Sequence, residues 1–172
     1  MINAHNIFFL LTFKVNKMFE KFGEVTNAKT LAKTIIEQRT IVPIKTIAEF
    51  KKAIHTAVKG NPQKYLAQVF QALRIQVNSE LEVLQNLLQQ IPSILKPHGR
   101  AAIITFHSLE DRIVKNFFKT GSITEGEKDD VYGTKPNNPL TIITKKPITA
   151  STEELKQNAR SRSAKLRVAE KK

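Results

Sequence analysis

Cysteine is absent from the 172-residue sequence, and tryptophan is absent with it. A chain without thiols has no disulfide framework, no zinc–thiolate site and no cysteine nucleophile. The four histidines are scattered without metal-ligand spacing, and the six glycines form no phosphate-binding loop. No metal is therefore expected, and the lack of cysteine favours the cytoplasm as the compartment.

The apolar N-terminal run Ile7–Phe13 is too short to span a bilayer, and it has neither a basic region before it nor a small-residue cleavage site after it. We expect it to form a strand or a buried segment. With 41% apolar residues, the chain is long enough for one domain with a real core, with or without an appendage.

Acidic residues are few. The chain has 15 Asp and Glu but 28 Lys and Arg, which gives a net charge of +13 and an isoelectric point near 10.0. Such an excess is typical of proteins that bind a polyanion, and nucleic acid is favoured over membrane because no separate basic amphipathic helix is present. A basic surface that is merely solvated is the alternative.

The first half of the sequence has helical periodicity, with apolar residues at helical intervals from about Asn16 to Ile91. Gly23 is expected to break or bend the first helix. Thr46 and Glu49 have the spacing of a capping box. The clearest pattern is one continuous apolar stripe, which predicts a single long helix from about Tyr65 to Gln90.

The period changes after a turn at Lys96–Arg100. Ala101–Phe106 predicts a strand too uniformly apolar to be a half-solvated edge strand, and Leu109–Phe118 predicts a helix. A polar loop follows, and two more strands are expected at about 140–146 and 164–170, joined by a segment with one helical turn. This order of elements is typical of the C-terminal part of an α/β layered fold.

Two residues at the end of the expected strand could carry chemistry. His107 and Ser108 lie where the next helix would begin, at the carboxyl end of a strand, where α/β folds place ligands. A Ser–His–acid triad is disfavoured because neighbouring side chains point to different sides at a strand end. Ser108 is expected to cap the helix, with Glu110 and Asp111 complementing its positive end.

Other polar residues form weaker patterns. Arg74 and Asn78 share one face of the predicted long helix, where a solvated surface is the default interpretation. In the basic tail, cations alternate with small residues, which suits either a strand that grips phosphate or an edge strand whose charges deter aggregation. The candidate nucleic-acid contacts are Lys145, Lys146, Arg160, Arg162, Lys165 and Arg167.

Four sequence blocks resemble one known family. They are Phe70–Leu84, Ile104–Phe118, Thr144–Thr149 and Asn158–Lys171, in the order and spacing of the C-terminal portion of the RsmH/MraW family. Its members are S-adenosylmethionine-dependent methyltransferases that modify the exocyclic N4 of a cytosine in small-subunit (16S) ribosomal RNA. The stretch Met18–Arg39 also resembles the start of the helical subdomain inserted in the family's Rossmann-like domain.

The resemblance implies an α/β fold: the C-terminal half of a Rossmann-like class I methyltransferase sheet plus an α-helical insertion subdomain. It divides the chain into an unmatched segment 1–15, part of the insertion subdomain at 16–62, and the C-terminal part of the methyltransferase domain at 63–172. It also implies S-adenosylmethionine as the cofactor and the RNA of the small ribosomal subunit as the partner, with no membrane involved.

Cofactor-binding elements of the family are not found in the sequence. These are a Gly-Gly-His loop after the first strand, an acidic residue after the second and an Asp-containing segment after the fourth, and a turn that is usually Gly-Gly is His98-Gly99. We therefore expect no cofactor-binding residues in this chain, and weak or no binding of S-adenosylmethionine by the chain alone. A truncated gene model, a disrupted gene, or a split enzyme completed by a separate N-terminal half would all give this sequence.

Two functions are consistent with these observations. In the first, the chain is a portion of the methyltransferase and is inactive alone. Its pocket-lining candidates are then His107, Ser108, Arg74 and Asn78, on the cytosine or methyl-donor side, while the basic tail holds RNA phosphate. In the second, the chain is a non-catalytic RNA-binding module built from the insertion helices and the basic ribbon. Neither function identifies a residue that performs the chemistry.

Overall fold

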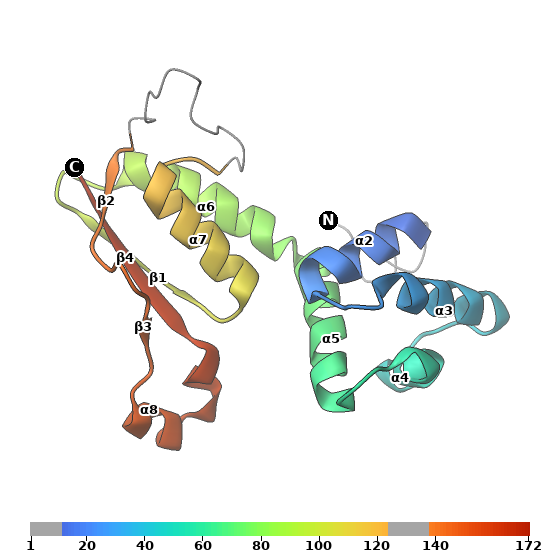
Figure 1. Cartoon of the computed structure of the whole chain (residues 1–172). Coiled ribbons are helices and arrows are strands. Elements are labelled where there is room, and N and C mark those ends of the chain that lie inside the picture. The colour runs from blue at the N-terminus through green and yellow to red at the C-terminus, as the bar shows by residue number, and fades with distance from the viewer. Residues whose placement is uncertain (1–11, 124–137) are drawn as a thin grey trace. The chain divides into compact units, whose positions relative to one another are not determined.

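Residues 12–123 and 138–172 are described by the computed structural model. They fall into two units, Met1–Glu80 and Leu81–Lys172. In the first unit the described residues form helices, whereas the second combines helices with a small antiparallel sheet (Figure 1).

The described part of the first unit is built from α-helices of 8 to 17 residues and one 3₁₀ helix of three residues. They are α2 (Thr12–Gly23), α3 (Ala28–Ile41), α4 (Ile47–Ile54), the short 3₁₀ helix η1 (His55–Ala57) and α5 (Pro62–Asn78). Most of the run Ile7–Phe13 lies outside the described residues, and its last two residues belong to α2 rather than to a strand. The expected capping box is confirmed, because the Thr46 hydroxyl accepts from the Glu49 amide and the Glu49 carboxylate accepts from the Thr46 amide.

Close packing and the side-chain amide of Asn27 hold these helices together. At Gly23, the last residue of α2, a Cβ atom would lie 2.7 Å from the Gln68 carbonyl oxygen of α5, so only glycine allows the two backbones to approach this closely. Asn27 precedes α3, and its Nδ2 donates to the Ala57 carbonyl at 2.8 Å while its Oδ1 accepts from the Tyr65 hydroxyl at 3.0 Å. Asn27 thereby joins α3, η1 and α5.

The prediction of one long helix from Tyr65 to Gln90 is wrong. α5 ends at Asn78, and α6 (Glu80–Ile94) begins after Ser79, whose φ of 50° and ψ of 37° are left-handed. That conformation ends a helix by turning the chain away from its axis. The apolar stripe is divided accordingly: Val77 packs on the core of the first unit, and Leu88 lies in the core of the second.

The second unit contains a four-stranded sheet. Its strands are β1 (Arg100–Thr105), β2 (Leu140–Ile142), β3 (Ile148–Thr149) and β4 (Lys165–Lys171), and its other elements are α6, α7 (Ser108–Thr120), α8 (Thr152–Gln157) and the 3₁₀ helix η2 (Ala159–Ser163). β4 pairs antiparallel with each of the other three strands. The strand expected at about 140–146 is shorter than predicted, because β2 ends at Ile142, and β3 begins at Ile148, beyond the predicted range.

The position of β1 in the sheet also differs from the prediction. The sequence of β1 is too apolar for an edge strand, yet in the described residues β1 pairs with β4 alone and is an edge. The side chain of Ile104 is 58% exposed, whereas Thr105, on the opposite face, is 2% exposed. One face of β1 is thus covered and the other is not.

Helices α6 and α7 lie on the covered face of the sheet (Figure 1). The core between them and the strands contains Leu88 and Ile91 of α6, Val114, Phe117 and Phe118 of α7, Leu140 of β2 and Ala169 of β4. None of the helices in the described ranges combines the length and the apolar character that crossing a bilayer requires.

Candidate functional site

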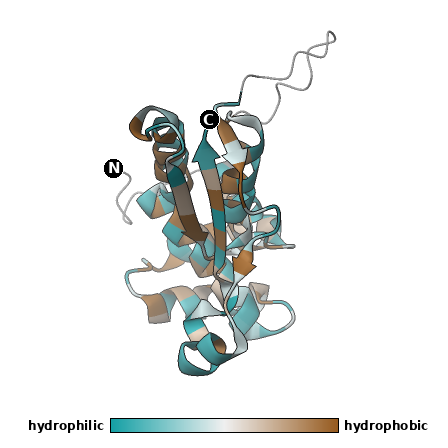
Figure 2. Cartoon of the chain, turned by 90° about the vertical axis from the view of Figure 1, so that its left-hand side faces the viewer, coloured by the Kyte–Doolittle hydropathy of each residue, from teal (hydrophilic) through white to brown (hydrophobic). Residues whose placement is uncertain are grey.

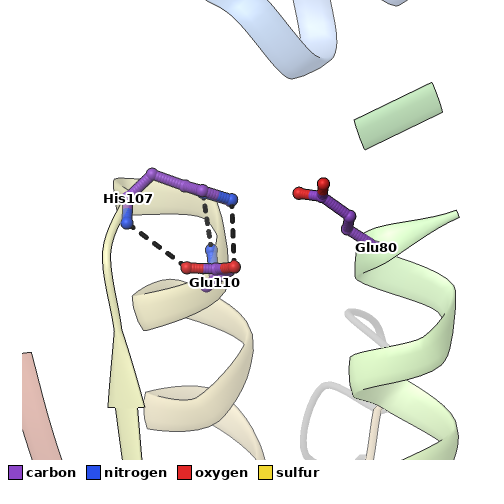
Figure 3. Close-up of side chains that lie close together, drawn as sticks. All are labelled: Glu80, His107 and Glu110. Carbon is purple, nitrogen blue, oxygen red and sulfur yellow. Dashed lines mark hydrogen bonds and ion pairs between the residues drawn. The ribbon is translucent and has the colours of Figure 1, made fainter. Parts of the chain in front are cut away.

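His107 joins the end of β1 to the start of α7, and its side chain caps the helix. Its Nδ1 accepts a hydrogen bond from the Glu110 amide at 3.3 Å. The Glu110 carboxylate in turn accepts from the backbone amide of Phe106 at 2.9 Å. It also accepts from the backbone amide of His107 at 3.3 Å (Figure 3). These reciprocal bonds form a capping box with an imidazole in the place that serine or threonine usually takes.

The prediction that Ser108 caps this helix is wrong by one position. Ser108 is the first residue of α7 and is exposed to solvent. Serine at 108 and aspartate at 111 have the same spacing as His107 and Glu110, so the sequence allows either box. The alternative is excluded because Asp111 binds cations of β4 and takes no part in the cap.

Glu110 is ionised by its place in this box. Burial raises the pKa of its carboxyl group, but the nearby His107 ring and the hydrogen bonds from the backbone amides of Phe106 and His107 outweigh burial, and the pKa is lowered overall. Because Nδ1 of His107 accepts from an amide, the ring proton lies on Nε2. Nε2 is 3.2 Å from Glu110 Oε1 but makes no aligned hydrogen bond, so we interpret this approach as an electrostatic contact only.

A buried ion pair connects α7 to the middle strand of the sheet. The Arg167 guanidinium donates to both oxygens of the Asp111 carboxylate, at 2.6 and 3.1 Å. Lys165 Nζ lies 3.4 Å from the same carboxylate. Asp111 and Arg167 are 8% and 7% exposed. The bidentate bond to Arg167 lowers the pKa of Asp111 more than burial raises it, and the charges of Arg167 and Lys165 lower it further.

The candidate nucleic-acid contacts therefore fall into two groups. Lys165 and Arg167 both bind Asp111, and the Arg167 side chain has little exposed surface left for RNA. The other four side chains are exposed: Lys145 and Lys146 lie between β2 and β3, and Arg160 and Arg162 lie on η2. Only this second group is placed to meet a phosphate backbone without breaking an existing bond.

Arg74 and Asn78, the remaining candidates, both contact the carboxylate of Glu80, a residue that the sequence patterns did not identify. Nε of Arg74 lies 2.9 Å from Glu80 Oε1, and Nδ2 of Asn78 donates to that oxygen at 3.1 Å. Arg74 and Asn78 lie in the C-terminal part of α5, Glu80 is the first residue of α6, and all three belong to the first unit. Glu80 could have been suspected from the sequence, because it lies two positions after Asn78 at a predicted polar face.

The described residues do not fit S-adenosylmethionine, the cofactor that the family resemblance implies. The glycines that the structure describes are Gly23, Gly60, Gly99 and Gly121. They lie at helix ends and turns, and none follows the carboxyl end of β1, where Phe106 and His107 lead directly into α7. The chain's own strand end thus lacks the glycine turn through which such folds approach a nucleotide-like ligand.

Comparisons with known proteins support the resemblance. The sequence model of the MraW methylase family matches residues 8–172. The chain is 49% identical over 166 residues to the "Ribosomal RNA small subunit methyltransferase H" of Azobacteroides pseudotrichonymphae, covering 94% of this chain and 54% of that protein. It is 50% identical over 158 residues to the protein of the same name from Amoebophilus asiaticus, covering 91% of this chain and 50% of the relative. The chain thus spans about half the length of these relatives.

The helix cap gives a test that separates His107 from Ser108. Replacing His107 with alanine removes the acceptor for the Glu110 amide and should lower the free energy of unfolding by about 1 kcal/mol. His107→Asn, which keeps a short acceptor, should recover most of that loss, and Ser108→Ala should change little. Urea unfolding followed by circular dichroism measures all three variants. Equal losses for His107→Ala and Ser108→Ala would contradict the assignment of the cap.

The buried pair predicts an acid-sensitive contribution to stability. Asp111→Asn leaves the Arg167 cation buried without its carboxylate, and should cost about 3 kcal/mol of unfolding free energy at neutral pH. The folded-state pKa of Asp111 is lowered from its ordinary value of 3.8, so the ionised form stabilises the fold above that pH. This contribution is lost as the pH falls through the lowered value.

Urea unfolding of the parent chain and of Asp111→Asn from pH 7 to pH 2 measures this contribution. The difference between the two curves should shrink below about pH 4. Glu170→Gln is the matched control, since its partner Arg100 is 64% exposed and that ion pair should add little. A difference between parent and Asp111→Asn that stays constant over the whole pH range would overturn the assignment.

Proposed function

The chain belongs to the MraW methylase family, and on that premise we propose that it is a portion of a methyltransferase. The enzyme would transfer the methyl group of S-adenosylmethionine to the exocyclic N4 of a cytosine in small-subunit ribosomal RNA, in the cytoplasm. The chain would contribute the C-terminal half of a Rossmann-like sheet and part of an inserted helical subdomain. The observation that carries the proposal is the match along residues 8–172, together with relatives named for methylation of that RNA.

In this proposal the exposed cations contact the RNA. Lys145, Lys146, Arg160 and Arg162 are solvent-exposed and belong to one unit. Cations of this kind bind nucleic acid mainly by neutralising phosphates and releasing counterions, which needs no special pocket. The net charge of +13 acts in the same direction by steering a polyanion toward the surface.

His107 acts in this proposal as a positioning residue. Its ring is committed to the cap of α7, so it fixes the direction in which the chain leaves β1. Ser108 is exposed at the first turn of α7 and stays a candidate for lining a pocket at that strand end. Arg74 and Asn78 stay candidates from the resemblance alone.

Methyl transfer with and without the remaining portion tests the proposal. We expect the purified chain alone to incorporate no labelled methyl group into small ribosomal subunits that lack the modification. Adding the portion of the Azobacteroides relative that this chain does not match should restore incorporation, with N4-methylated cytosine seen by mass spectrometry of the nucleosides. That portion alone is the control. Failure of the mixture to methylate, or micromolar binding of S-adenosylmethionine by the pure monomeric chain, would contradict the proposal.

A non-catalytic RNA-binding module is the second candidate function. The observation that favours it is the combination of exposed cations on η2 with a strand end that does not fit the methyl donor. In that case the chain would bind ribosomal RNA by itself, and methyl transfer would stay absent whatever is added.

Salt dependence distinguishes specific phosphate contact from general charge. Replacing Arg160 and Arg162 with alanine should weaken binding to a small-subunit RNA fragment, and should reduce the slope of log affinity against log salt by about 2, since each cation releases about one counterion. The control is the double variant Lys115→Ala and Lys119→Ala, which removes the same charge from exposed positions of α7, outside both the insertion helices and the basic tail. Filter binding between 50 and 200 mM salt measures both. Identical slopes for the two double variants would remove Arg160 and Arg162 from the interface.

A further inference from the structure

The exposed cations of the second unit can hold RNA, but they cannot choose a base. The α8–η2 segment, which carries Arg160 and Arg162, is coloured as largely hydrophilic (Figure 2). Contacts of this kind meet phosphate groups, which fix the register of a nucleic acid but carry no sequence information. Recognition of one base needs hydrogen-bond donors and acceptors that are held in a fixed order.

Three side chains at the end of α5 have such an order. Nε of Arg74 donates to Glu80 Oε2 at 3.2 Å and lies 2.9 Å from Oε1. Nδ2 of Asn78 donates to Oε1 at 3.1 Å. The left-handed residue Ser79 lies between Asn78 and Glu80, so the chain turns at the place where the side chains meet. We call Arg74, Asn78 and Glu80 the Glu80 cluster.

Stability does not account for the Glu80 cluster. The Arg74 side chain is 56% exposed, and Asn78 is also exposed. Ion pairs with a side chain this exposed add little to the free energy of folding, because water screens the charges and fixing long side chains costs entropy. What the contacts achieve is orientation, since the Glu80 carboxylate receives a cation and an amide and is held beside both.

The Glu80 cluster also has hydrogen-bonding capacity to spare. In the described part of the chain, the terminal nitrogens Nη1 and Nη2 of Arg74 make no hydrogen bond or ion pair. The Asn78 amide uses one of its two hydrogens on Glu80, and Glu80 Oε2 accepts one bond where a carboxylate oxygen can accept two. The cluster therefore offers an acceptor beside donors from two other side chains.

We infer that the Glu80 cluster recognises the base-pairing edge of an unpaired cytosine. This inference rests on the proposed function. Cytosine presents its N4 amine as a donor, followed by N3 and O2 as acceptors. A carboxylate is the side-chain acceptor that pairs with N4, so Glu80 Oε2 takes the amine. The Arg74 guanidinium then donates to N3, and the second hydrogen of the Asn78 amide donates to O2.

The other bases fit this order less well. Uracil has an acceptor, O4, where cytosine has its amine, and a donor where cytosine has N3. It would therefore place an oxygen against the Glu80 carboxylate and an N–H group against the Arg74 cation. Adenine shares the amine and the ring acceptor with cytosine but has a C–H group in the place of O2, which leaves the Asn78 donor without a partner.

Arg74 has two roles in this arrangement. Its Nε orients the Glu80 carboxylate, while its Nη groups bind the base, and only the planar fork of a guanidinium supplies both sets of donors at once. Lysine has the same charge but a single nitrogen. The choice of base should therefore depend on the shape of residue 74 as well as on its charge.

RNA binding by the full chain, without a methyl donor, tests this recognition. The probes are short single-stranded RNAs of uridines whose central nucleotide is cytidine, adenosine or uridine, and fluorescence anisotropy measures their affinities. We expect the cytidine RNA to bind about tenfold more tightly than the all-uridine RNA, with the adenosine RNA between them. In NMR spectra, the Nε–H signal of Arg74 and the side-chain amide signals of Asn78 should shift with the cytidine RNA and not with the all-uridine RNA.

Glu80→Gln gives the most direct variant. It keeps the shape of the side chain, but its amide can donate to O4 of uracil, so the preference for cytidine should vanish or reverse. Arg74→Lys gives an independent reading and should lower the preference for cytidine while leaving the affinity for the all-uridine RNA nearly unchanged. Glu82→Gln is the matched control, because it removes the same charge from an exposed position of α6 and should keep the preference of the parent chain. All three variants should keep the melting curve of the parent chain.

The outcomes are separable from those of the proposed function. The inference is wrong if the cytidine RNA does not bind, if the three RNAs bind equally, or if Glu80→Gln and Arg74→Lys both keep the preference of the parent chain. None of these readings involves methyl transfer. A chain that selects cytidine through Glu80 but never supports methylation would uphold the recognition site and reject the proposed function. Restored methylation by a chain whose Glu80 cluster selects no base would do the opposite.

Discussion

The second unit depends on one strand. β1, β2 and β3 each pair with β4 and, among the described residues, with no other strand, so the sheet exists only through β4. The Arg167–Asp111 pair then binds β4 to α7 by a bidentate contact that is almost fully buried. Desolvating these two charges is costly, and the two parallel hydrogen bonds offset that cost only while the geometry holds. The pair therefore sets the position of α7 on the sheet, and with it the turn at His107.

Much of the fold could be predicted from sequence, and the failures have local causes. The Thr46–Glu49 box and the helix after residue 107 follow from spacing and periodicity, and the structure confirms both. The break at Ser79 was not predictable, because a helical stripe continues across it and nothing in Asn78-Ser79 demands a left-handed residue. The edge position of β1 was missed for a different reason, since its sequence fits a strand with neighbours on both sides.

The candidate site was harder to predict than the fold. Serine is generally a better helix cap than histidine, yet the cap is His107. The reason is that Arg167, 56 positions after Asp111 in the sequence, binds the Asp111 carboxylate and prevents it from forming a capping box with Ser108. The Asp111 contact also changes the role of Arg167. The alternation of cations and small residues along the tail predicts that Arg167 binds phosphate, whereas the structure shows it bound to Asp111. Neither the cap at His107 nor the ion pair of Arg167 can be predicted from neighbouring residues in the sequence. Both depend on the tertiary contact that Asp111 makes.

The central place of β4 also constrains how the molecule is made. The ends of the β1–β4 ladder, such as Arg100 and Glu170, are 70 positions apart in the sequence. During synthesis β1 emerges well before β4, the strand that pairs with it among the described residues, so its isoleucines stay exposed to water until β4 has been made. Closing so long a loop is slow compared with forming the helices of the first unit. The helical unit therefore has time to fold before the sheet does.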